Sequence, residues 1–275
     1  MSSQKLEEVD RYSRQIALFG AEGQSRISKA SIAVVGLGGL GSHICQQMAY
    51  LGVRHWVIID HDIVDESNLN RLIGATQDDI GVAKTEIAKR LISSIQPASI
   101  VEAFTKRIPD PSLDDSLKSV DLIFGCLDND FPRSLLLKVA SENQRRYIDC
   151  ATDIPSEDAL IHGGRVLSMG VDRGCLHCLG HLDQNMIRRA QMNDEELEVE
   201  ARIYGVPVET LNASGPSVVN LNGVVASLAS MEAMAILTEL RVPKKFLNYR
   251  ADLGTVNSNK DKPLEECYYC SVWCL

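Results

Sequence analysis

The sequence has no long apolar run and no excess of basic residues. No window approaches the ~20 apolar residues that a membrane span requires, so we expect no membrane segment. The N-terminus is charged and has no apolar stretch, which argues against a signal peptide. The formal net charge is −9 and no basic run offers a footprint for phosphates, so general nucleic-acid binding is not expected. Together these features predict a cytoplasmic protein.

Apolar, strand-like runs alternate with helix-like segments over the first 150 residues. This alternation is typical of a mainly parallel sheet that is covered by helices on both faces. We therefore predict a Rossmann-like, doubly wound α/β fold. The predicted strands are 31–35, 55–60, 99–104, 121–126 and 146–150, and the helices between them are 41–52, 82–95 and 131–144.

The second half of the chain has a different texture. Residues 180–215 are polar and acidic, which indicates a mobile crossover segment, and 217–240 is apolar nearly all round, which predicts a buried helix. A strand with a glycine break at 161–170 and a strand pair at 246–253 predict a C-terminal antiparallel extension. Because we find no internal repeat and no low-complexity linker, we expect one domain over residues 1–275.

A glycine-rich turn joins the first predicted strand to the first helix. Residues 36–41 read Gly-Leu-Gly-Gly-Leu-Gly, the G-x-G-x-x-G spacing in its required strand–turn–helix context. Such glycines let backbone N–H groups approach phosphates, and the helix directs the positive end of its dipole toward them. Asp60 ends the second strand, where a carboxylate can accept hydrogen bonds from a ribose. These features predict binding of NAD, FAD or ATP, and the alternative is a glycine turn without a ligand.

A polar cluster downstream favours a triphosphate over a nicotinamide cofactor. Asp62, Asn68, Asn70 and Arg71 lie where an ordinary Rossmann unit enters its next helix, and Lys84 lies on that helix. Cationic side chains stabilise the charge that develops on a triphosphate during transfer. The alternative is that these side chains are solvated surface charges. The predicted organisation is an N-terminal helical arm (1–30), a nucleotide-binding half (31–155), and a part with the crossover segment, the buried helix and a zinc-binding region (156–275).

Two C-x₂-C pairs have the local spacing of a tetrahedral zinc–thiolate site. They are Cys175 with Cys178 and Cys267 with Cys270. A redox pair is the alternative, although neither pair opens a helix after a strand. Four thiolates would leave no open coordination position, so the predicted metal is structural. Of the other candidates, Cys45, Cys126 and Cys150 are predicted core residues, His177 and His181 bystanders, and Cys274 a bystander or alternative ligand.

Several motifs together resemble the ThiF/MoeB family, the bacterial relatives of ubiquitin-activating enzymes. These motifs are RYSRQ, GLGGLG, the acid after the second strand, SNLNR, the helical lysine and CLDND, and the likeness runs from about residue 11 to residue 270. The resemblance implies ATP-dependent adenylation of the C-terminal carboxylate of a ubiquitin-like or sulfur-carrier protein, with release of pyrophosphate. A carboxylate is already ionised at neutral pH, so this chemistry needs positive charge and in-line placement and no general base.

The resemblance also implies a role for each motif residue. Asp60 would hold the ribose, and Asp128 in CLDND would bind Mg²⁺, its alternative being an N-cap of the helix that follows. Arg14 in RYSRQ would reach the ATP of a neighbouring subunit, which implies a homodimer, and the two cysteine pairs would hold Zn²⁺. The implied catalytic residues are Arg14, Arg71, Lys84 and Asp128, and the implied nucleotide contacts are Gly36, Gly38, Gly39, Gly41, Asp60, Asp62, Asn68, Arg71, Lys84 and Asp128.

The sequence departs from the family in one respect. Many relatives carry a cysteine between the zinc pairs that accepts the activated carboxyl group, but residues 179–266 contain none. Asn212 and Ser214 occupy the comparable stretch, and no base is indicated that would activate the serine. We therefore expect the reaction to stop at the acyl-adenylate.

Three alternatives to this function remain. One is adenylation of a peptide or of a tRNA-bound carboxylate, which the motifs do not separate from adenylation of a carrier protein. Another is a non-catalytic scaffold or dimer partner with the same fold. The last is an NAD-dependent oxidoreductase, for which no catalytic histidine or Tyr-x-x-x-Lys pair stands out.

Overall fold

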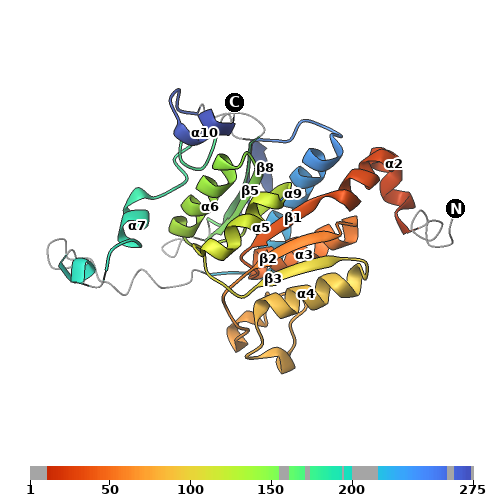
Figure 1. Ribbon diagram of the computed structural model, residues 1–275, viewed down its shortest axis with the longest axis horizontal. Coiled ribbons are helices and arrows are strands. Elements are labelled where there is room, and N and C mark those ends of the chain that lie inside the picture. Colours follow the sequence, from red (N-terminus) through yellow and green to blue (C-terminus); the bar gives the residue numbers. More distant parts are fainter. Residues whose placement is uncertain are drawn as a thin grey trace.

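The computed structural model describes residues 11–154, 161–170, 174–193, 195–199, 216–258 and 263–273. Within these residues, eight strands form one sheet in the order β3-β2-β1-β4-β5-β6-β7-β8 (Figure 1). The first five strands pair in parallel, and β6, β7 and β8 extend the sheet with antiparallel pairs. The predicted fold class is therefore confirmed. The strands are β1 (Ser31–Val35), β2 (His55–Ile59), β3 (Ile100–Phe104), β4 (Leu122–Gly125), β5 (Arg146–Asp153), β6 (Gly163–Met169), β7 (Phe246–Arg250) and β8 (Thr255–Ser258).

The central strands β1 and β4 are buried on both faces, whereas β8 is exposed. Successive side chains of a strand point to opposite faces of the sheet. In β1, Ile32 and Val34 belong to one apolar cluster, while Ala33 and Val35 belong to the other. This is why the central strands read as continuous apolar runs. The first cluster lies under α2 (Ser13–Lys29), α3 (Gly39–Leu51), α4 (Lys84–Ile95) and α9 (Val219–Thr238), and the second lies under α5 (Asp114–Ser119) and α6 (Asp130–Glu142) with α10 (Tyr268–Trp273) against α6.

Most predicted element boundaries differ from those of the structure by one to three residues. Helix α3 begins at Gly39, inside the glycine turn, two residues before the predicted start at Gly41. The predicted strand pair 246–253 contains β7, but residues 251–254 form a turn with Gly254 at φ +62°, so β8 starts at Thr255. The predicted crossover segment 180–215 includes a short helix, α7 (Gln184–Arg189), and its residues 200–215 lie outside the described residues.

Helix α9 corrects the expectation that no window resembles a membrane span. Among the described residues it is the one helix that is long and apolar enough to cross a membrane, judged by length and composition alone. It has 20 residues and a mean hydropathy of 1.4 over its most apolar window. In the fold, 61% of that window is buried inside the protein, where α9 packs against α2, α3, β5 and β6. Burial on most sides explains why the helix is apolar nearly all round.

Helix α2 is kinked at Gly20, whose φ of +76° and ψ of +167° interrupt the helical backbone. After the kink, Gly23 and Ile27 are buried, and an added Cβ at Gly23 would lie 3.4 Å from Thr238 of α9. Before the kink, Gln15 donates a hydrogen bond to the carbonyl of Tyr50 at the end of α3. The predicted helical arm is therefore two helical segments, and Arg14 lies on the first of them.

Candidate active site

The glycine turn lies at the carboxyl end of β1 and packs tightly on the protein itself. Gly36 has φ +88°, and a Cβ at this position would lie 2.5 Å from the carbonyl oxygen of Cys126, in the loop after β4. A Cβ at Gly41 would lie 1.9 Å from the carbonyl oxygen of Gly36. A Cβ at Gly38 would meet nothing within 4 Å, so this side of the turn is open. Gly38 is also the N-cap of α3 and makes no side-chain cap, so the first N–H groups of the helix are available to an anion.

Asp60 anchors the glycine turn to the end of β2. Its carboxylate is 7% exposed; one oxygen accepts the N–H of Leu37 at 2.6 Å and the other accepts the N–H of Asp62 at 2.8 Å. Burial raises the pKa of Asp60, and the Leu37 N–H and the charge of Lys84 oppose this shift. Each oxygen keeps a lone pair for a further donor. The ribose contact stays a prediction, and the hydrogen bond to Leu37 fixes the glycine turn.

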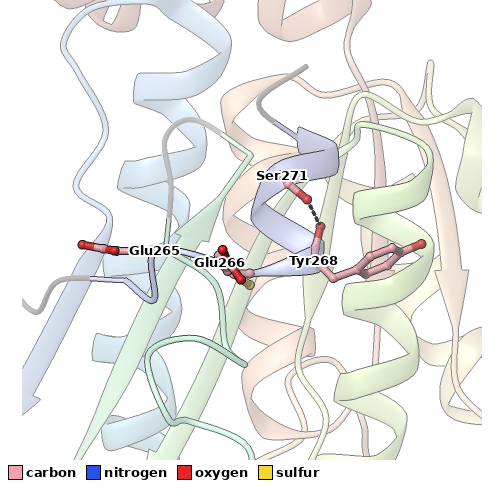
Figure 2. Close-up of a pocket in the computed structure, with 5 residues that line it drawn as sticks. Glu265, Glu266, Tyr268 and Ser271 are labelled. Carbon is pink, nitrogen blue, oxygen red and sulfur yellow. Dashed lines mark hydrogen bonds between the residues drawn. The ribbon is translucent and has the colours of Figure 1, made fainter.

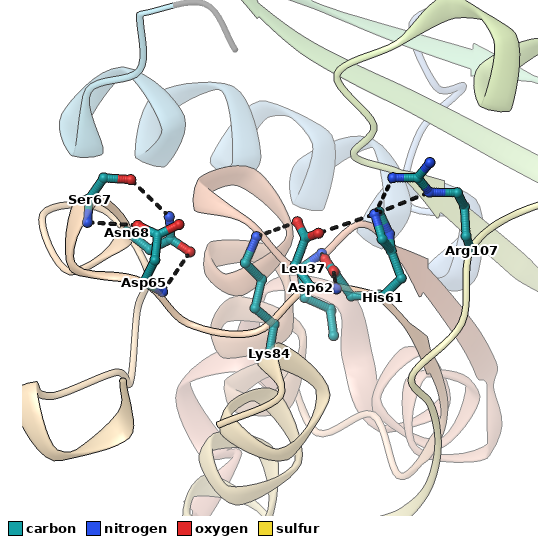
Figure 3. A network of polar contacts seen from close by, with 9 residues as sticks. Leu37, His61, Asp62, Asp65, Ser67, Asn68, Lys84 and Arg107 are labelled. Atoms are coloured by element: carbon teal, nitrogen blue, oxygen red, sulfur yellow. Dashed lines mark hydrogen bonds and ion pairs between the residues drawn. The ribbon is translucent and has the colours of Figure 1, made fainter. Parts of the chain in front are cut away.

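Lys84 and Asp62 form an ion pair beside this turn (Figure 3). The ammonium lies 2.7 Å from Asp62 Oδ2, and the Lys84 side chain is 12% exposed. Lys84 is the first residue of α4, where a positive charge opposes the helix dipole, so the carboxylate compensates an otherwise unfavourable position. Partial burial of Asp62 raises its pKa, but Lys84, His61 and Arg107 outweigh burial and lower it overall. The Asp62 carboxylate is therefore ionised at neutral pH.

His61 and Arg107 extend this network to the loop after β3 (Figure 3). Arg107 Nη2 lies 2.8 Å from His61 Nε2, and His61 Nε2 lies 3.1 Å from Asp62 Oδ1. The sequence pattern did not identify either residue, because neither belongs to a phosphate-binding motif. The signal that could have identified them is their position in the chain. His61 directly follows Asp60, and Arg107 lies in the loop after the neighbouring strand β3.

Asn68 ends a short helical turn, η1 (Glu66–Asn68), that follows β2, and Arg71 lies in the turn directly after it. Asn68 is buried and completes a capping box, its Oδ1 accepting the N–H of Asp65 at 3.5 Å (Figure 3). Arg71 donates to the carbonyl of Ser67 and to Asn70 Oδ1 at 3.1 Å. Its Cδ lies 3.6 Å from where a Cβ at Gly39 would be. Arg71 therefore sits directly beside the glycine turn, as a phosphate-binding side chain requires.

Asp128 lies in the loop after β4, the loop that packs against Gly36. Its side chain is exposed and forms no hydrogen bond or ion pair with any described residue. The alternative that Asp128 caps α6 is wrong, because the N-cap is Asn129, whose Oδ1 accepts the N–H of Phe131 at 2.9 Å. The Asp128 carboxylate is thus free to act as a ligand.

Arg14 is exposed on the first segment of α2 and has no partner among the described residues. The structure thus brings Arg71, Lys84 and the Asp128 loop to the glycine turn but contains one subunit. The predicted contact of Arg14 with a neighbouring subunit's ATP stays a prediction.

Asn222 of α9 is a residue of this site that the sequence pattern missed. It is 1% exposed, donates to Ser217 Oγ at 3.0 Å, and its Nδ2 lies 2.1 Å from where a Cβ at Gly39 would be. The space beside Gly39 is thus filled by the protein and not open to a ligand. The signal in the sequence that could have identified Asn222 is a polar side chain near the start of an otherwise apolar helix.

Cys175, Cys178, Cys267 and Cys270 come together in a buried cluster, although 88 residues separate the two pairs. The Sγ–Sγ distances are 3.7 Å for Cys175–Cys178, 3.6 Å for Cys175–Cys267 and 3.7 Å for Cys178–Cys270. A tetrahedral site with Zn–S bonds of about 2.3 Å has sulfur–sulfur edges of about 3.8 Å, so the cluster fits zinc. A hydrogen bond with Cys175 is the main cause that lowers the pKa of Cys270 to about 5. A thiolate is the form that binds a metal.

A shallow depression of about 350 Å³ lies next to the cysteine cluster (Figure 2). It is lined by Glu265, Glu266, Tyr268 and Ser271 together with Cys267, and by no residue of the nucleotide site.

The remaining cysteines and histidines follow the prediction in part. Cys45 and Cys150 are fully buried, Cys126 is half-buried, His177 packs edge-on against Tyr269, His181 packs on Phe246, and Cys274, Asn212 and Ser214 lie outside the described residues.

The sheet order and the glycine turn define an α/β protein of the Rossmann type with an anion-binding helix start at the carboxyl edge of its parallel strands. The sequence matches the ThiF family over residues 12–269. The chain belongs to this family.

Two relatives are named as adenylyltransferases of sulfur carrier proteins. The chain is 28% identical over 237 residues to the sulfur carrier protein ThiS adenylyltransferase of Escherichia coli, covering 85% of this chain and 83% of that protein. It is 36% identical over 137 residues to the sulfur carrier protein adenylyltransferase of Thermus thermophilus, covering 49% of this chain and 50% of that protein. The match thus spans about half the length of the Thermus relative. Among solved structures, E. coli MccB with AMPCPP and MccA matches with a TM-score of 0.74, 20% identity, and coverage of 94% of this chain and 74% of that chain, a likeness of fold.

Proposed function

We propose that this protein is an ATP-dependent adenylyltransferase that activates the C-terminal carboxylate of a ubiquitin-fold sulfur-carrier protein. The observation that carries the proposal is the grouping of Lys84, Arg71 and the Asp128 loop around one open glycine turn. The names of the two sulfur-carrier adenylyltransferases support the choice of substrate. A scaffold without activity would not need two cations and a free carboxylate at an anion-binding turn.

The reaction is a substitution at the α-phosphorus of ATP. A carboxylate oxygen of the carrier forms a bond to this phosphorus, and the bond from the phosphorus to the α,β-bridging oxygen breaks. Pyrophosphate leaves with the electron pair, so no atom is oxidised or reduced. The first N–H groups of α3 would orient the phosphates, and Lys84 and Arg71 would stabilise the negative charge that develops on the leaving oxygens.

Two metal ions belong to the proposal. Asp128 is the carboxylate that would hold Mg²⁺, which would neutralise part of the phosphate charge; its exposed and unpaired state supports this role. The four-cysteine cluster would hold Zn²⁺ as a structural ion, because its sulfur spacing matches a closed tetrahedral site.

Assembly and location are also part of the proposal. We propose a homodimer in which Arg14 of one subunit completes the site of the other, since the exposed Arg14 forms no hydrogen bond or ion pair with described residues of its own subunit. A cytoplasmic location is supported by the seven described cysteines, all of them free thiols, because thiols stay reduced in the cytosol. The end product would be the acyl-adenylate, passed on to a thiol that this chain does not supply between residues 179 and 266.

The test is ATP–pyrophosphate exchange with labelled pyrophosphate and purified carrier proteins that end in a free carboxylate. We expect exchange that depends on both the carrier and Mg²⁺. The control is the same carrier with a C-terminal amide, which cannot attack phosphorus and should give no exchange. Exchange with short peptides at the rate of the carrier would favour peptide activation instead. Absence of exchange with every carrier and peptide, in a protein of native fold, would contradict the proposal.

A further inference from the structure

Arg133 of α6 contacts the loop that carries Asp128. Its guanidinium is almost fully buried, with the side chain 7% exposed. Nε donates a hydrogen bond to the carbonyl oxygen of Leu127 at 2.9 Å, and Nη2 donates to the same oxygen. This carbonyl belongs to the peptide group that joins Leu127 to Asp128. Two donors on one oxygen fix the orientation of that peptide plane, and therefore the direction in which the Asp128 side chain leaves the loop.

A buried carboxylate holds Arg133 in this position. Asp149 of β5 is fully buried, and its Oδ1 lies 3.8 Å from Arg133 Nε. The same Oδ1 accepts the hydroxyl of Tyr147 at 3.0 Å, while Arg165 Nη2 lies 3.9 Å from Oδ2. Burial is the largest single effect on the pKa of Arg133 and lowers it, but Asp149 together with Tyr147, Asp130 and Cys150 raises this pKa overall. The guanidinium is therefore charged.

The loop is constrained from its other side as well. The carbonyl oxygen of Cys126 lies 2.5 Å from where a Cβ at Gly36 would be, so the loop with Asp128 is held between the glycine turn and Arg133. A further contact ties the same helix start to the chain that leaves the cysteine cluster. Asp130 Oδ2 accepts the N–H of Asp183 at 2.9 Å, and its Oδ1 lies 3.7 Å from Arg133 Nη1.

We propose that Arg133 is a positioning residue that fixes the Leu127–Asp128 peptide, so that the Asp128 carboxylate is held ready to bind the divalent cation of the ATP complex. The inference rests on the proposed function. Arg133 does not touch the substrate itself. Groups that orient a metal ligand typically change metal affinity 10–100-fold when they are removed.

The experiment separates positioning from simple support of the fold. Arg133→Met removes both donors and leaves the buried Asp149 with Arg165, 3.9 Å away, as its remaining described cation, which is destabilising. The double variant Arg133→Met with Asp149→Asn removes the charge pair together and leaves an amide oxygen that can accept from Tyr147. The control is Arg241→Met, because Arg241 also pairs with a buried carboxylate, Glu232 at 2.6 Å, but has no described contact with residues 126–130.

Two readouts are measured on each full-length variant. Binding of Mn²⁺ in the presence of AMPCPP is followed by electron paramagnetic resonance, and the Mg²⁺ dependence of pyrophosphate exchange is measured in parallel. Thermal unfolding reports the fold. We expect the double variant to unfold cooperatively, at a temperature lowered by the loss of the Asp149–Arg165 pair, and to bind Mn²⁺ at least about tenfold more weakly. Arg241→Met should also lose thermal stability but keep its metal affinity.

The outcomes distinguish the two proposals. Wild-type metal affinity in the folded double variant would overturn the positioning role of Arg133, whatever the rate of pyrophosphate exchange. Equal weakening of metal affinity in Arg241→Met would also overturn it, because the effect would then follow general destabilisation. If the wild-type protein itself binds no Mn²⁺ with AMPCPP and catalyses no exchange, the proposed function has failed instead.

Discussion

Replacement of Lys84 by methionine tests the electrostatic basis of the proposed reaction. Methionine keeps most of the aliphatic length of lysine and removes the charge. Lys84 is 12% exposed beside the glycine turn, so its charge acts in a partly desolvated position. Two unit charges 4 Å apart interact by about 4 kcal/mol at an effective dielectric constant of about 20. Loss of one donor that stabilises transition-state charge typically lowers kcat by 10²–10³-fold.

The ion pair with Asp62 places the expected effect at the lower end of this range. Asp62 lies 2.7 Å from the ammonium and offsets part of its field at the phosphates. We therefore expect pyrophosphate exchange to fall about 100-fold. The cost in stability should be small, because Asp62 is 47% exposed and half-exposed ion pairs contribute about 1 kcal/mol or less. For a protein of this size, that corresponds to a melting temperature lowered by about 4 °C or less.

The matched control is Lys89→Met, which removes an exposed lysine from the same helix. Exchange kinetics and thermal unfolding are measured for both variants. Lys89→Met should keep wild-type exchange. An exchange rate for Lys84→Met within about threefold of wild type would refute the argument, since it would correspond to less than ~1 kcal/mol of transition-state stabilisation.

Three further predictions follow from the structure. Arg90 holds the pKa of Asp79 well below its usual range. The ion pair therefore stabilises the fold above about pH 4, and its contribution is lost as the pH falls further. Asp79→Asn should lower the melting temperature at pH 7, and the difference in melting temperature from wild type should narrow below pH 4. Cys270→Ser should lower the zinc content measured by atomic emission and lower the melting temperature, while a chelator should do the same to wild type. If Arg14 acts across a dimer interface, Arg14→Ala and Asp128→Ala should each be inactive, and equal mixing with subunit exchange should restore about a quarter of wild-type exchange, whereas action within one subunit should restore none.

The central part of the fold could be predicted from the sequence because its strands are short apolar runs separated by turn residues. β1 was predicted to the residue, since a strand buried on both faces carries a continuous signal. The start of α3 was placed too late because glycines are poor helix formers, yet Gly39 and Gly41 are helical here. The short elements η1 and α7 were missed because they have no long apolar periodicity. Each is defined instead by a side-chain cap, at Asp65 and Asp183 respectively.

The site was predicted only as far as local motifs reach. The glycine turn, Arg71 and Lys84 belong to recognisable segments, and the fold brings them together. Asn222 and Arg133 could not be identified in this way, because their roles arise from contacts between α9 and α3 or between α6 and the loop after β4. Such contacts depend on tertiary packing, which a pattern along the chain does not encode.

The backbone angle at Gly20 sets where the side chain of Arg14 can reach. Gly20 lies between the anchored end of α2 and the segment with Arg14, and a Cβ at this position would meet nothing within 4 Å. A change of residue there would thus alter the direction of the first segment through backbone strain of about 1 kcal/mol and not through a clash. In the proposed homodimer, the geometry between subunits could in this way be adjusted at a single residue, without repacking either apolar cluster.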